Sequence, residues 1–499
     1  MDQTTQPQHA GEPLSPLLRQ VLARTADEDS YRRWERQVAT TGYCSHPVRL
    51  TGGFDAADRR TGEVRPVFTT EGEPDGVLLK ACGNRRASRC RSCSAVYRAD
   101  TWQLVAAGLR GGKGMPESVA EHPRLFVTLT APSFGPVHSR RLDTGGRPRS
   151  CRPHARGCCP HGRPLRCQQR HSERDPLLGS PICADCFDYE GAVLWNAVVP
   201  ELWRRTTIYL HRALAGAVGL SRAALSRQVR LSFTKVAEYQ ARGSVHFHAV
   251  LRLDAAGPGE STSGPPARYT AGLLARVVRQ TVPQVSTPLP TARGEVSRPV
   301  GWGHQLDVRV IDAASETANP TAIAAYVAKY ATKSSTELGH TLDSRLRTAE
   351  EIVALKVPEH VRRLVEACWQ LGGQPHLADL QLRRWAHMLG FRGHFSTRSR
   401  RYSTTLTLLR TARADHQRAT AAARHPDRTE ESPVDPAVVA ADPDSIEIIS
   451  RWRYAGSGYR TEGDRLLAAS AADRHWLSWE EARLSRRTDD PDDLAMLVA

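Results

Sequence analysis

The sequence predicts an α+β fold built around one antiparallel hairpin. Over residues 245–253, apolar side chains occupy every odd position, which is the alternation of a strand with one buried face. Residues 229–240 are also extended in pattern, and the short turn at 241–244 joins the two segments into a hairpin. Apolar residues recur at helical spacing over 192–225 and 270–282, so helices accompany the hairpin.

Further elements are predicted on both sides of the hairpin. Residues 14–40 are helical in pattern, whereas 124–130 and 305–311 have the pattern of strands. Asn319 followed by Pro320 predicts the start of a helix, because asparagine caps the first turn and proline suits the first helical position. Beyond residue 340 the pattern is mostly helical.

Changes in composition along the chain suggest five regions. In order, they are a helical and zinc-binding N-terminal region (1–115), a central domain (116–337) with a cysteine-rich insertion at about 139–190, a basic helical region (338–424), a linker (425–445), and a small C-terminal module with an acidic tail (446–499). The linker is predicted from its proline and aspartate content.

The overall composition favours a polyanionic partner and a reducing compartment. Among the 499 residues, lysine and arginine outnumber aspartate and glutamate by 69 to 53, so nucleic acid is the first candidate partner. The N-terminus is polar, and no apolar run approaches the roughly 20 residues that span a bilayer. We therefore expect a cytoplasmic protein without a membrane partner, in which eleven clustered cysteines bind zinc rather than form disulfides.

The cysteines form two candidate structural zinc sites. Cys90 and Cys93 have the two-residue gap of a zinc knuckle, and Cys82 with Cys44 (or His46) completes four ligands. The insertion has few apolar residues to order it, so a metal is its expected organiser. Its favoured ligands are Cys159, Cys167, Cys183 and Cys186, with His161 and His171 as substitutes and a second ion left open.

A different metal site is predicted on the hairpin. His246 and His248 project from the same face of their strand, where both can bind one ion. Pairing across the turn brings Glu238 towards them, with Gln240 as a competing ligand. Two imidazoles and a carboxylate leave coordination positions open, which suits Mg²⁺ or Mn²⁺ that must also bind substrate oxygen. The alternative is two polar residues on an exposed strand.

The helix that begins at Asn319 carries candidate nucleophiles. Tyr326 and Tyr330 are four residues apart, as are Lys329 and Lys333, so all four share one side of the helix. Beside a metal-bound phosphate and a lysine, the tyrosine anion becomes accessible and can attack a DNA phosphodiester. The product would be a 5′-phosphotyrosine and a free 3′ hydroxyl. Alternatively, the two tyrosines only bury aromatic edges of an amphipathic helix.

A basic segment near residue 400 is a candidate DNA-binding surface. Residues 381–424 contain ten arginines and a single acid, interleaved with aromatic residues. Such a pattern suits contacts to phosphates and stacking on bases. The predicted DNA-binding residues are Arg398, Arg400, Arg401 and Tyr402.

These motifs resemble those of a known superfamily, the HUH endonucleases. The resemblance lies in Val-His-Phe-His-Ala-Val, in Tyr-Val-Ala-Lys-Tyr-Ala-Thr-Lys and in the strand at Thr128–Thr130. More closely, the chain resembles RepSA-like replication initiators of actinobacterial plasmids and integrative elements. That similarity runs from about residue 40 to 480 and includes Lys-Val-Ala-Glu-Tyr-Gln and Gly-His-Phe-Ser-Thr-Arg-Ser-Arg-Arg-Tyr.

The resemblance implies a rolling-circle initiator that nicks a double-strand origin. It implies a central antiparallel sheet flanked by helices, with His246 and His248 as metal ligands and Glu238 as the acidic ligand. Tyr326 and Tyr330 match the pair of phage initiators in which both tyrosines act, whereas many plasmid members use one. The partners would be plasmid origin DNA, a host helicase and a DNA polymerase, because the chain has no phosphate-binding loop of the helicase type.

Two other functions are compatible with the same residues. A relaxase or tyrosine transposase would use the same chemistry. A zinc-containing DNA-binding regulator without catalysis would use the cysteines and arginines only.

Overall fold

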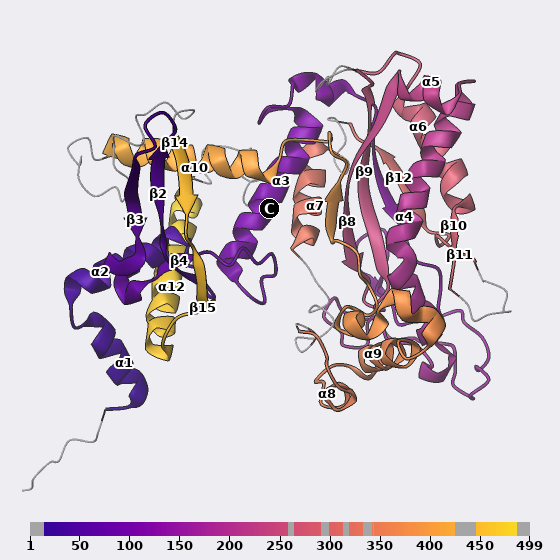
Figure 1. Cartoon of the computed structure of the whole chain (residues 1–499). Helices are drawn as coiled ribbons and strands as arrows, with labels where there is room; N and C mark the ends of the chain where they lie inside the picture. The colour runs from indigo at the N-terminus through magenta and orange to yellow at the C-terminus, as the bar shows by residue number, and fades with distance from the viewer. Residues whose placement is uncertain are drawn as a thin grey trace, which may run out of the picture. The chain divides into compact units, whose positions relative to one another are not determined.

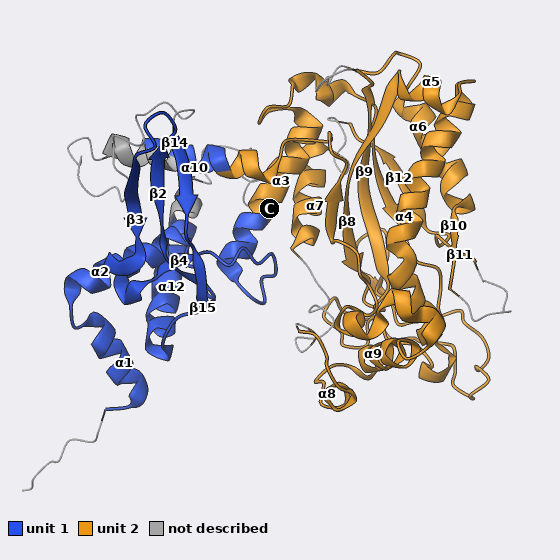
Figure 2. Ribbon diagram, viewed as in Figure 1, with its two compact units in different colours: residues 1–97, 411–494 blue, residues 98–410, 495–499 orange. Residues whose placement is uncertain are grey.

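The computed structural model describes residues 14–257, 264–290, 299–312, 319–332, 342, 344–424 and 446–486 (Figure 1). The chain forms two compact units, one of residues 1–97 and 411–494 and the other of residues 98–410 and 495–499 (Figure 2). Both contain helices and antiparallel strands, so the predicted α+β class is confirmed. None of the described helices has the length and apolar character needed to span a membrane.

The first unit joins strands from the two ends of the chain. One sheet has the order β15-β1-β4 and the other the order β14-β2-β3, and all pairings are antiparallel. The strands are β1 (Val48–Thr51), β2 (Gly53–Asp58), β3 (Val64–Thr69), β4 (Leu78–Lys80), β14 (Ile446–Ser450) and β15 (Arg453–Ser457). The helices are α1 (Pro16–Thr25), α2 (Glu28–Thr40) and α12 (Glu462–Arg486), with the first part of α3 (Arg91–Arg110).

This arrangement corrects the predicted C-terminal module at 446–499. Its strands complete sheets begun by N-terminal strands, since an unpaired strand edge leaves backbone groups unsatisfied. Arg24 on α1 bonds both to Asp464 on α12, at 2.6 Å, and to Asp75, at 2.5 Å. Residues 446–486 and the N-terminal segment therefore form one unit. The predicted linker at 425–445 and the acidic tail from 487 onward lie outside the described residues.

The second unit contains a five-stranded antiparallel sheet of order β12-β5-β9-β8-β13. Its strands are β5 (Arg124–Leu129), β8 (Val229–Tyr239), β9 (Val245–Ala255), β12 (Leu306–Val310) and β13 (Ser396–Arg398). The predicted hairpin is confirmed, because β8 and β9 pair along their whole length from Val229↔Ala255 to Tyr239↔Val245.

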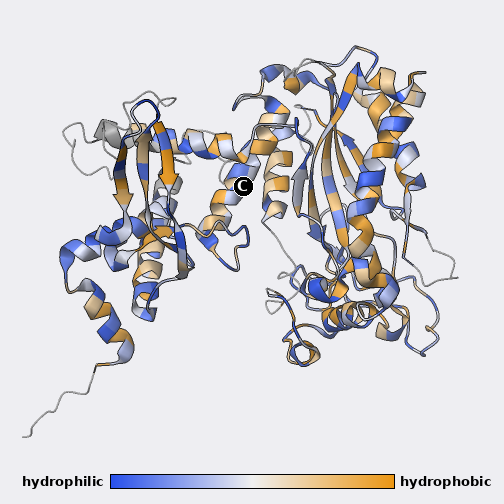
Figure 3. Ribbon diagram, in the orientation of Figure 1, coloured by the Kyte–Doolittle hydropathy of each residue, from blue (hydrophilic) through white to orange (hydrophobic). Residues whose placement is uncertain are grey.

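One face of this sheet carries the apolar core. The odd-numbered residues of β9 are buried together with apolar residues of α4 (Tyr189–Ala217) and α6 (Ala271–Thr281), and Figure 3 shows the apolar stretches of the strands and of these helices. The Trp195 indole N–H donates to the Val245 carbonyl at 3.0 Å, which fixes α4 across the start of β9. A large mixed sheet-and-helix core follows from this packing.

The opposite face of the sheet is polar, and its two ends differ. Near the hairpin turn it carries His246 and His248, beside α7 (Pro320–Ala331), which contacts β8. At the far end, Arg252 and Asp254 are completely buried and bond to each other at 2.6 Å. The last turn of α3 covers this end, where its Gly108 carbonyl accepts a hydrogen bond from Arg252.

The predicted basic region at 338–424 is divided between the two units, because its residues up to 410 belong with the central domain and residues 411–424 belong to the first unit. Strand β13 forms the edge of the sheet by pairing with β8, and α9 (Glu359–Leu371) packs on α4. The other helices of this region are α8 (Ala349–Val353) and α10 (Leu406–Arg424). The remaining short elements of the second unit are α5 (Arg222–Ser226), β6 (Arg141–Leu142), β7 (Pro148–Arg149), β10 (Ser286–Pro288) and β11 (Pro299–Gly301).

Candidate metal centre and tyrosine pair

The hairpin brings the three predicted metal ligands together. Glu238 pairs directly with His246 in the β8–β9 register, and His248 follows two residues later on the same face. The Oε2 atom of Glu238 lies 3.0 Å from His246 Nε2 and 3.2 Å from His248 Nε2. The two Nε2 atoms are 3.2 Å apart. The competing ligand Gln240 instead accepts a hydrogen bond from Arg242 Nε at 2.9 Å.

These three atoms suit a small divalent ion. Adjacent ligands at about 2.1 Å from an octahedral ion lie about 3.0 Å apart. Burial raises the pKa of Glu238, but its close contacts with His246 and His248 outweigh burial and lower the pKa to about 2. Burial lowers the pKa of His248, so its imidazole is neutral and can offer a lone pair. A carboxylate oxygen and two imidazole nitrogens thus converge on one point.

A neighbouring strand orients His248. Thr128 on β5 pairs directly with His248 on β9, and its hydroxyl lies 3.0 Å from His248 Nδ1. With the proton on Nδ1, the ring donates to the threonine and leaves Nε2 free for a metal. The Phe126 ring stacks on the imidazole with centroids 5.9 Å apart, which limits rotation of the imidazole.

Helix α7 holds both tyrosines against the histidines. Its start is as predicted, with the Asn319 side chain accepting from the Ala322 backbone N–H at 2.8 Å. The Tyr326 hydroxyl lies 3.0 Å from His248 Nε2, the same nitrogen that faces Glu238. The Tyr330 ring is 4.5 Å from the Tyr326 ring and 5.9 Å from His248. Both tyrosines are half-buried beside the three metal ligands.

The surroundings of Tyr326 keep its phenol protonated. Burial raises its pKa, and the charges of Tyr330 and Glu238 raise it further. A divalent cation at the adjacent ligands acts in the opposite direction, because positive charge favours the phenolate. Lys329 is exposed, and its Nζ atom lies 5.7 Å from the centre of the Tyr330 ring. Lys333 lies outside the described residues.

The structure corrects one of the predicted DNA-binding residues. Arg400 and Arg401 are exposed and Arg398 is half-buried on β13, but Tyr402 is 0% exposed. Its ring fills the space left by Gly108, where a Cβ atom would lie 2.4 Å from the ring. Tyr402 is therefore a core residue that cannot stack on a base. Arginine-rich flanks alone did not reveal this burial.

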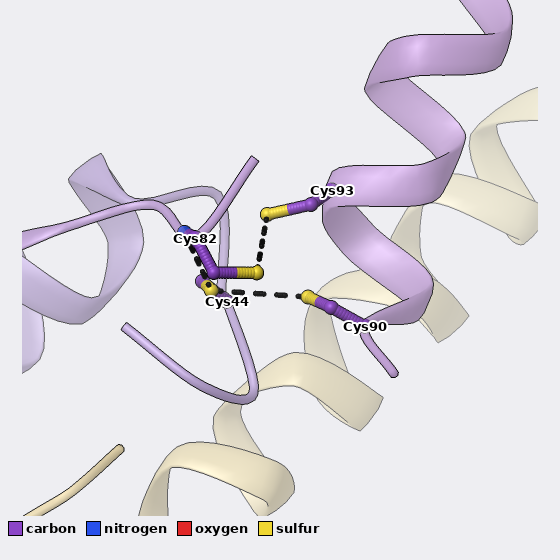
Figure 4. Close-up of side chains that lie close together, drawn as sticks. All are labelled: Cys44, Cys82, Cys90 and Cys93. Atoms are coloured by element: carbon purple, nitrogen blue, oxygen red, sulfur yellow. Dashed lines mark hydrogen bonds between the residues drawn. The ribbon is translucent and has the colours of Figure 1, made fainter. Parts of the chain in front are cut away.

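The four N-terminal cysteines converge as predicted. Figure 4 shows Cys44, Cys82, Cys90 and Cys93 pointing towards one another, and His46 is not part of the group. The Sγ atoms of Cys82 and Cys93 are 3.6 Å apart, and those of Cys90 and Cys44 are 3.8 Å apart. These separations are too long for disulfides, and all four cysteines are free.

The insertion contains two ligand groups, where the sequence favoured one set of four cysteines and left open both a second ion and the substitution of His161 and His171. Cys159, Cys183 and Cys186 lie together as predicted, but His161 is their fourth member. Cys167 belongs to a second group with His138, Cys151 and His171. An isolated β-bridge between Arg152 and Cys167 places Cys151 and Cys167 on neighbouring segments. Sequence reasoning missed His138, which precedes the predicted insertion and has no Cys-x-x-Cys spacing to indicate it.

Comparison with known proteins places this chain in a family. The family model described as "Replication initiator protein, pSAM2" (RepSA) matches residues 30–473. The chain belongs to the RepSA family. It is 44% identical over 479 residues to a replication initiator protein of Streptomyces ambofaciens, covering 94% of this chain and 96% of that protein. No solved structure matches the chain.

A basic cavity lies at the hairpin end of this RepSA chain. Its volume is about 620 Å³, and it includes Gln240, two residues beyond Glu238. Arg140 and Arg152 from the insertion and Arg242 from the hairpin turn contribute to its lining. Arg242 also donates to the carbonyls of Ala131 and Pro132, so it ties the turn to the end of β5. Positive side chains thus gather at the turn of the hairpin that carries the candidate metal ligands.

Proposed function

We propose that this replication initiator nicks and rejoins one strand of its plasmid origin by the transesterification of HUH endonucleases. The observation that carries the proposal is the 3.0 Å approach of the Tyr326 hydroxyl to His248 Nε2. That nitrogen is also one of three atoms that converge on a candidate ion site. A nucleophile beside a metal site is the arrangement that phosphodiester transfer requires.

The proposed reaction exchanges one phosphate ester for another. A Mg²⁺ or Mn²⁺ ion at Glu238, His246 and His248 would supply positive charge to the scissile phosphate. The Tyr326 oxygen forms a bond to phosphorus, and the bond from phosphorus to the 3′ oxygen breaks. The phenol loses a proton and the leaving 3′ oxygen gains one. The product is a 5′-phosphotyrosine and a free 3′ hydroxyl that can prime synthesis by a host polymerase, with a host helicase to unwind the duplex.

The second tyrosine supports strand transfer. Tyr330 lies 4.5 Å from Tyr326, measured between ring centroids, so either hydroxyl can reach a phosphate bound at the same ion. While Tyr326 holds one DNA end, Tyr330 can attack a regenerated origin, with the exposed ammonium of Lys329 close to its ring. We propose Tyr326 as the first nucleophile because its hydroxyl is within hydrogen-bond distance of a metal ligand.

Surrounding positive charge supports binding of a DNA strand. Arg140 and Arg152 line the cavity beside the hairpin turn, and Arg400 and Arg401 are exposed on the same unit. Arginine side chains in such positions neutralise phosphates and release counterions. The proposed substrate is single-stranded or extruded origin DNA, since a flexible single strand can bring its phosphate close to a half-buried tyrosine more readily than a duplex can.

A nicking assay on supercoiled origin DNA tests the proposal. In Mn²⁺, the wild-type protein should give relaxed circles with protein on the 5′ end. Tyr326→Phe should reduce the initial nicking rate at least about 100-fold, because it removes the proposed first nucleophile and leaves only Tyr330, whose ring lies farther from His248. Tyr209→Phe is the matched control, since Tyr209 is exposed on α4. A double variant Tyr326→Phe/Tyr330→Phe that still forms the covalent adduct would disprove the mechanism.

The same assay separates the alternatives. A zinc-containing DNA-binding regulator would retard origin DNA without cutting it. A relaxase or transposase would also nick origin DNA and would lose activity in the same tyrosine variants. It would not support accumulation of single-stranded plasmid copies in cells.

We also propose a structural zinc ion at Cys44, Cys82, Cys90 and Cys93. Three of these cysteines are buried, and their sulfur atoms already lie at the separations of tetrahedral ligands.

A further inference from the structure

The order of the ligands along the insertion alternates between its two groups. His138 and Cys151 belong to one group, and the next pair, Cys159 and His161, belongs to the other. Cys167 and His171 then return to the first group, and Cys183 and Cys186 complete the second. The chain segment between two ligands of one group therefore contains ligands of the other group. Two ions bound in this way would brace the insertion in a crossed manner.

The ligand atoms of the first group are spaced for zinc. Sulfur at about 2.3 Å and nitrogen at about 2.0 Å from a tetrahedral ion lie about 3.3 to 3.8 Å from each other. His138 Nδ1 is 3.2 Å from His171 Nε2, and Cys167 Sγ is 3.7 Å from the same nitrogen. In the second group, His161 Nδ1 lies 3.2 Å from Cys186 Sγ and 3.9 Å from Cys183 Sγ.

Hydrogen bonds with residues outside the first group orient two of its side chains. The fully buried His171 ring donates through Nδ1 to the Asp175 carboxylate at 2.7 Å, which leaves Nε2 as a lone pair facing His138 and Cys167. A histidine between a carboxylate and a metal is a common arrangement in zinc proteins. Cys151 Sγ accepts the backbone N–H of Ser139 at 3.2 Å, which holds the sulfur atom in place.

The insertion has no apolar core to hold it without ions. Between residues 139 and 186, all of which the structure describes, the buried side chains are Cys151, Cys159, Cys167, His171 and Cys183. Every one of them belongs to a ligand group. Its only strand pair, β6 with β7, has two residues in each strand. Metal binding is therefore the interaction that can supply its folding free energy.

We propose that residues 138–186 form a cross-braced module with two zinc ions, one bound by two cysteines and two histidines and the other by three cysteines and His161. The first ion ties the segment after β5 to the insertion through His138, and the second ties the insertion to the start of α4 through Cys186. Because the ligands interleave, loss of one ion loosens the segment that holds the other. Arg140 and Arg152, which line the cavity near the metal centre, stand on the segments that the module fixes.

Zinc content of the full chain tests this assignment independently of nicking. Protein purified in excess Mg²⁺ should lose at least one zinc ion per chain on His171→Ala or on Cys151→Ser, as measured by plasma mass spectrometry. His154→Ala and Cys158→Ser are the matched controls, because both residues are exposed in the insertion and belong to neither group. They should keep the wild-type zinc content. Unchanged zinc in both His171→Ala and Cys151→Ser would overturn the proposal.

X-ray absorption at the zinc edge of the wild-type protein gives a second test that needs no variant. The proposal predicts a mixed shell of sulfur and nitrogen. A shell of sulfur alone, as expected for an insertion held by Cys159, Cys167, Cys183 and Cys186, would also overturn it.

Discussion

At the scale of single residues, the hydroxyl of Thr128 contacts one of the three ligands of the candidate metal centre. It lies 3.0 Å from His248 Nδ1 and so helps to hold the ring in the orientation in which Nε2 faces Glu238 and Tyr326. Partners of this kind, one bond away from a metal, raise the basicity of the ligand and fix its orientation. Thr128 thus acts as a positioning residue through His248.

Thr128→Val should weaken Mn²⁺ binding by about 10- to 100-fold, because the isosteric side chain leaves Nδ1 without its partner. Titration calorimetry of the wild type and variant measures this change. Thr128→Ser keeps the hydroxyl and should retain most of the affinity. Equal Mn²⁺ affinity in Thr128→Val and the wild type would show that the contact does not orient His248.

Another single residue links stability to pH. Lys235 projects into the apolar face of the sheet, where its Nζ atom lies 3.9 Å from the centre of the Phe247 ring. Burial lowers its pKa from 10.5 to about 7. Between these two values the unfolded chain holds a proton that the folded chain has lost. This site therefore makes the free energy of unfolding rise with pH from about 7 to 10.5.

Lys235→Met should raise the free energy of unfolding at pH 7 and remove that part of the rise between pH 7 and 9.5, since methionine fills the site without a charge. Urea unfolding at the two pH values measures both effects. Lys113→Met, at an exposed position, should leave the profile unchanged. A Lys235→Met protein with the pH profile of the wild type would mean that the buried ammonium is not the cause.

At the scale of elements, buried arginines bind the C-terminal turn of α3 through hydrogen bonds. Arg252 and Arg124 donate to the carbonyls of Gly108 and Leu109, which no residue within the helix satisfies. Positive charge at this end also complements the helix dipole. Asp254 compensates Arg252 and also binds His122 at 2.8 Å. The polar face of the sheet is thus covered by α3 at the end that carries Arg252 and Asp254.

Arg252→Met should destabilise the second unit by about 3–5 kcal/mol, because it leaves Asp254 buried with less compensating charge. Arg204→Met provides the contrast, since it removes an exposed ion pair with Glu201 and should cost less than about 1 kcal/mol. Urea unfolding followed by far-ultraviolet circular dichroism compares the two. Similar losses for both variants would contradict the role assigned to the buried network.

The elements that the sequence predicted are those with a strong local signal. Strict alternation revealed β9 and its pairing with β8, and the Asn-Pro pair located the start of α7. Strand β13 was missed because three residues carry no periodicity. The burial of Arg252, Asp254 and Tyr402 was missed because polar residues on alternating positions normally indicate solvent, whereas here α3 covers them.

At the scale of the whole molecule, contacts between distant segments determine both units. Strands β14 and β15 pair with β2 and β1, respectively, although about 400 residues separate the paired strands in the chain. Local sequence patterns do not indicate pairing over such a separation. The candidate site was more accessible to sequence reasoning, because its ligands lie on one hairpin and its tyrosines on one helix turn. The two interleaved ligand groups of the insertion lacked that advantage.

Mass spectrometry of the DNA-linked peptide tests the central claim most directly. Trypsin cleaves after Arg309, Lys329 and Lys333, so Tyr326 and Tyr330 fall on different peptides, 310–329 and 330–333. After a single round of nicking in Mn²⁺, the residual nucleotide mass should lie on peptide 310–329. In Tyr326→Phe, peptide 310–329 should carry no nucleotide mass. A covalent adduct on a peptide that contains neither tyrosine would contradict the account.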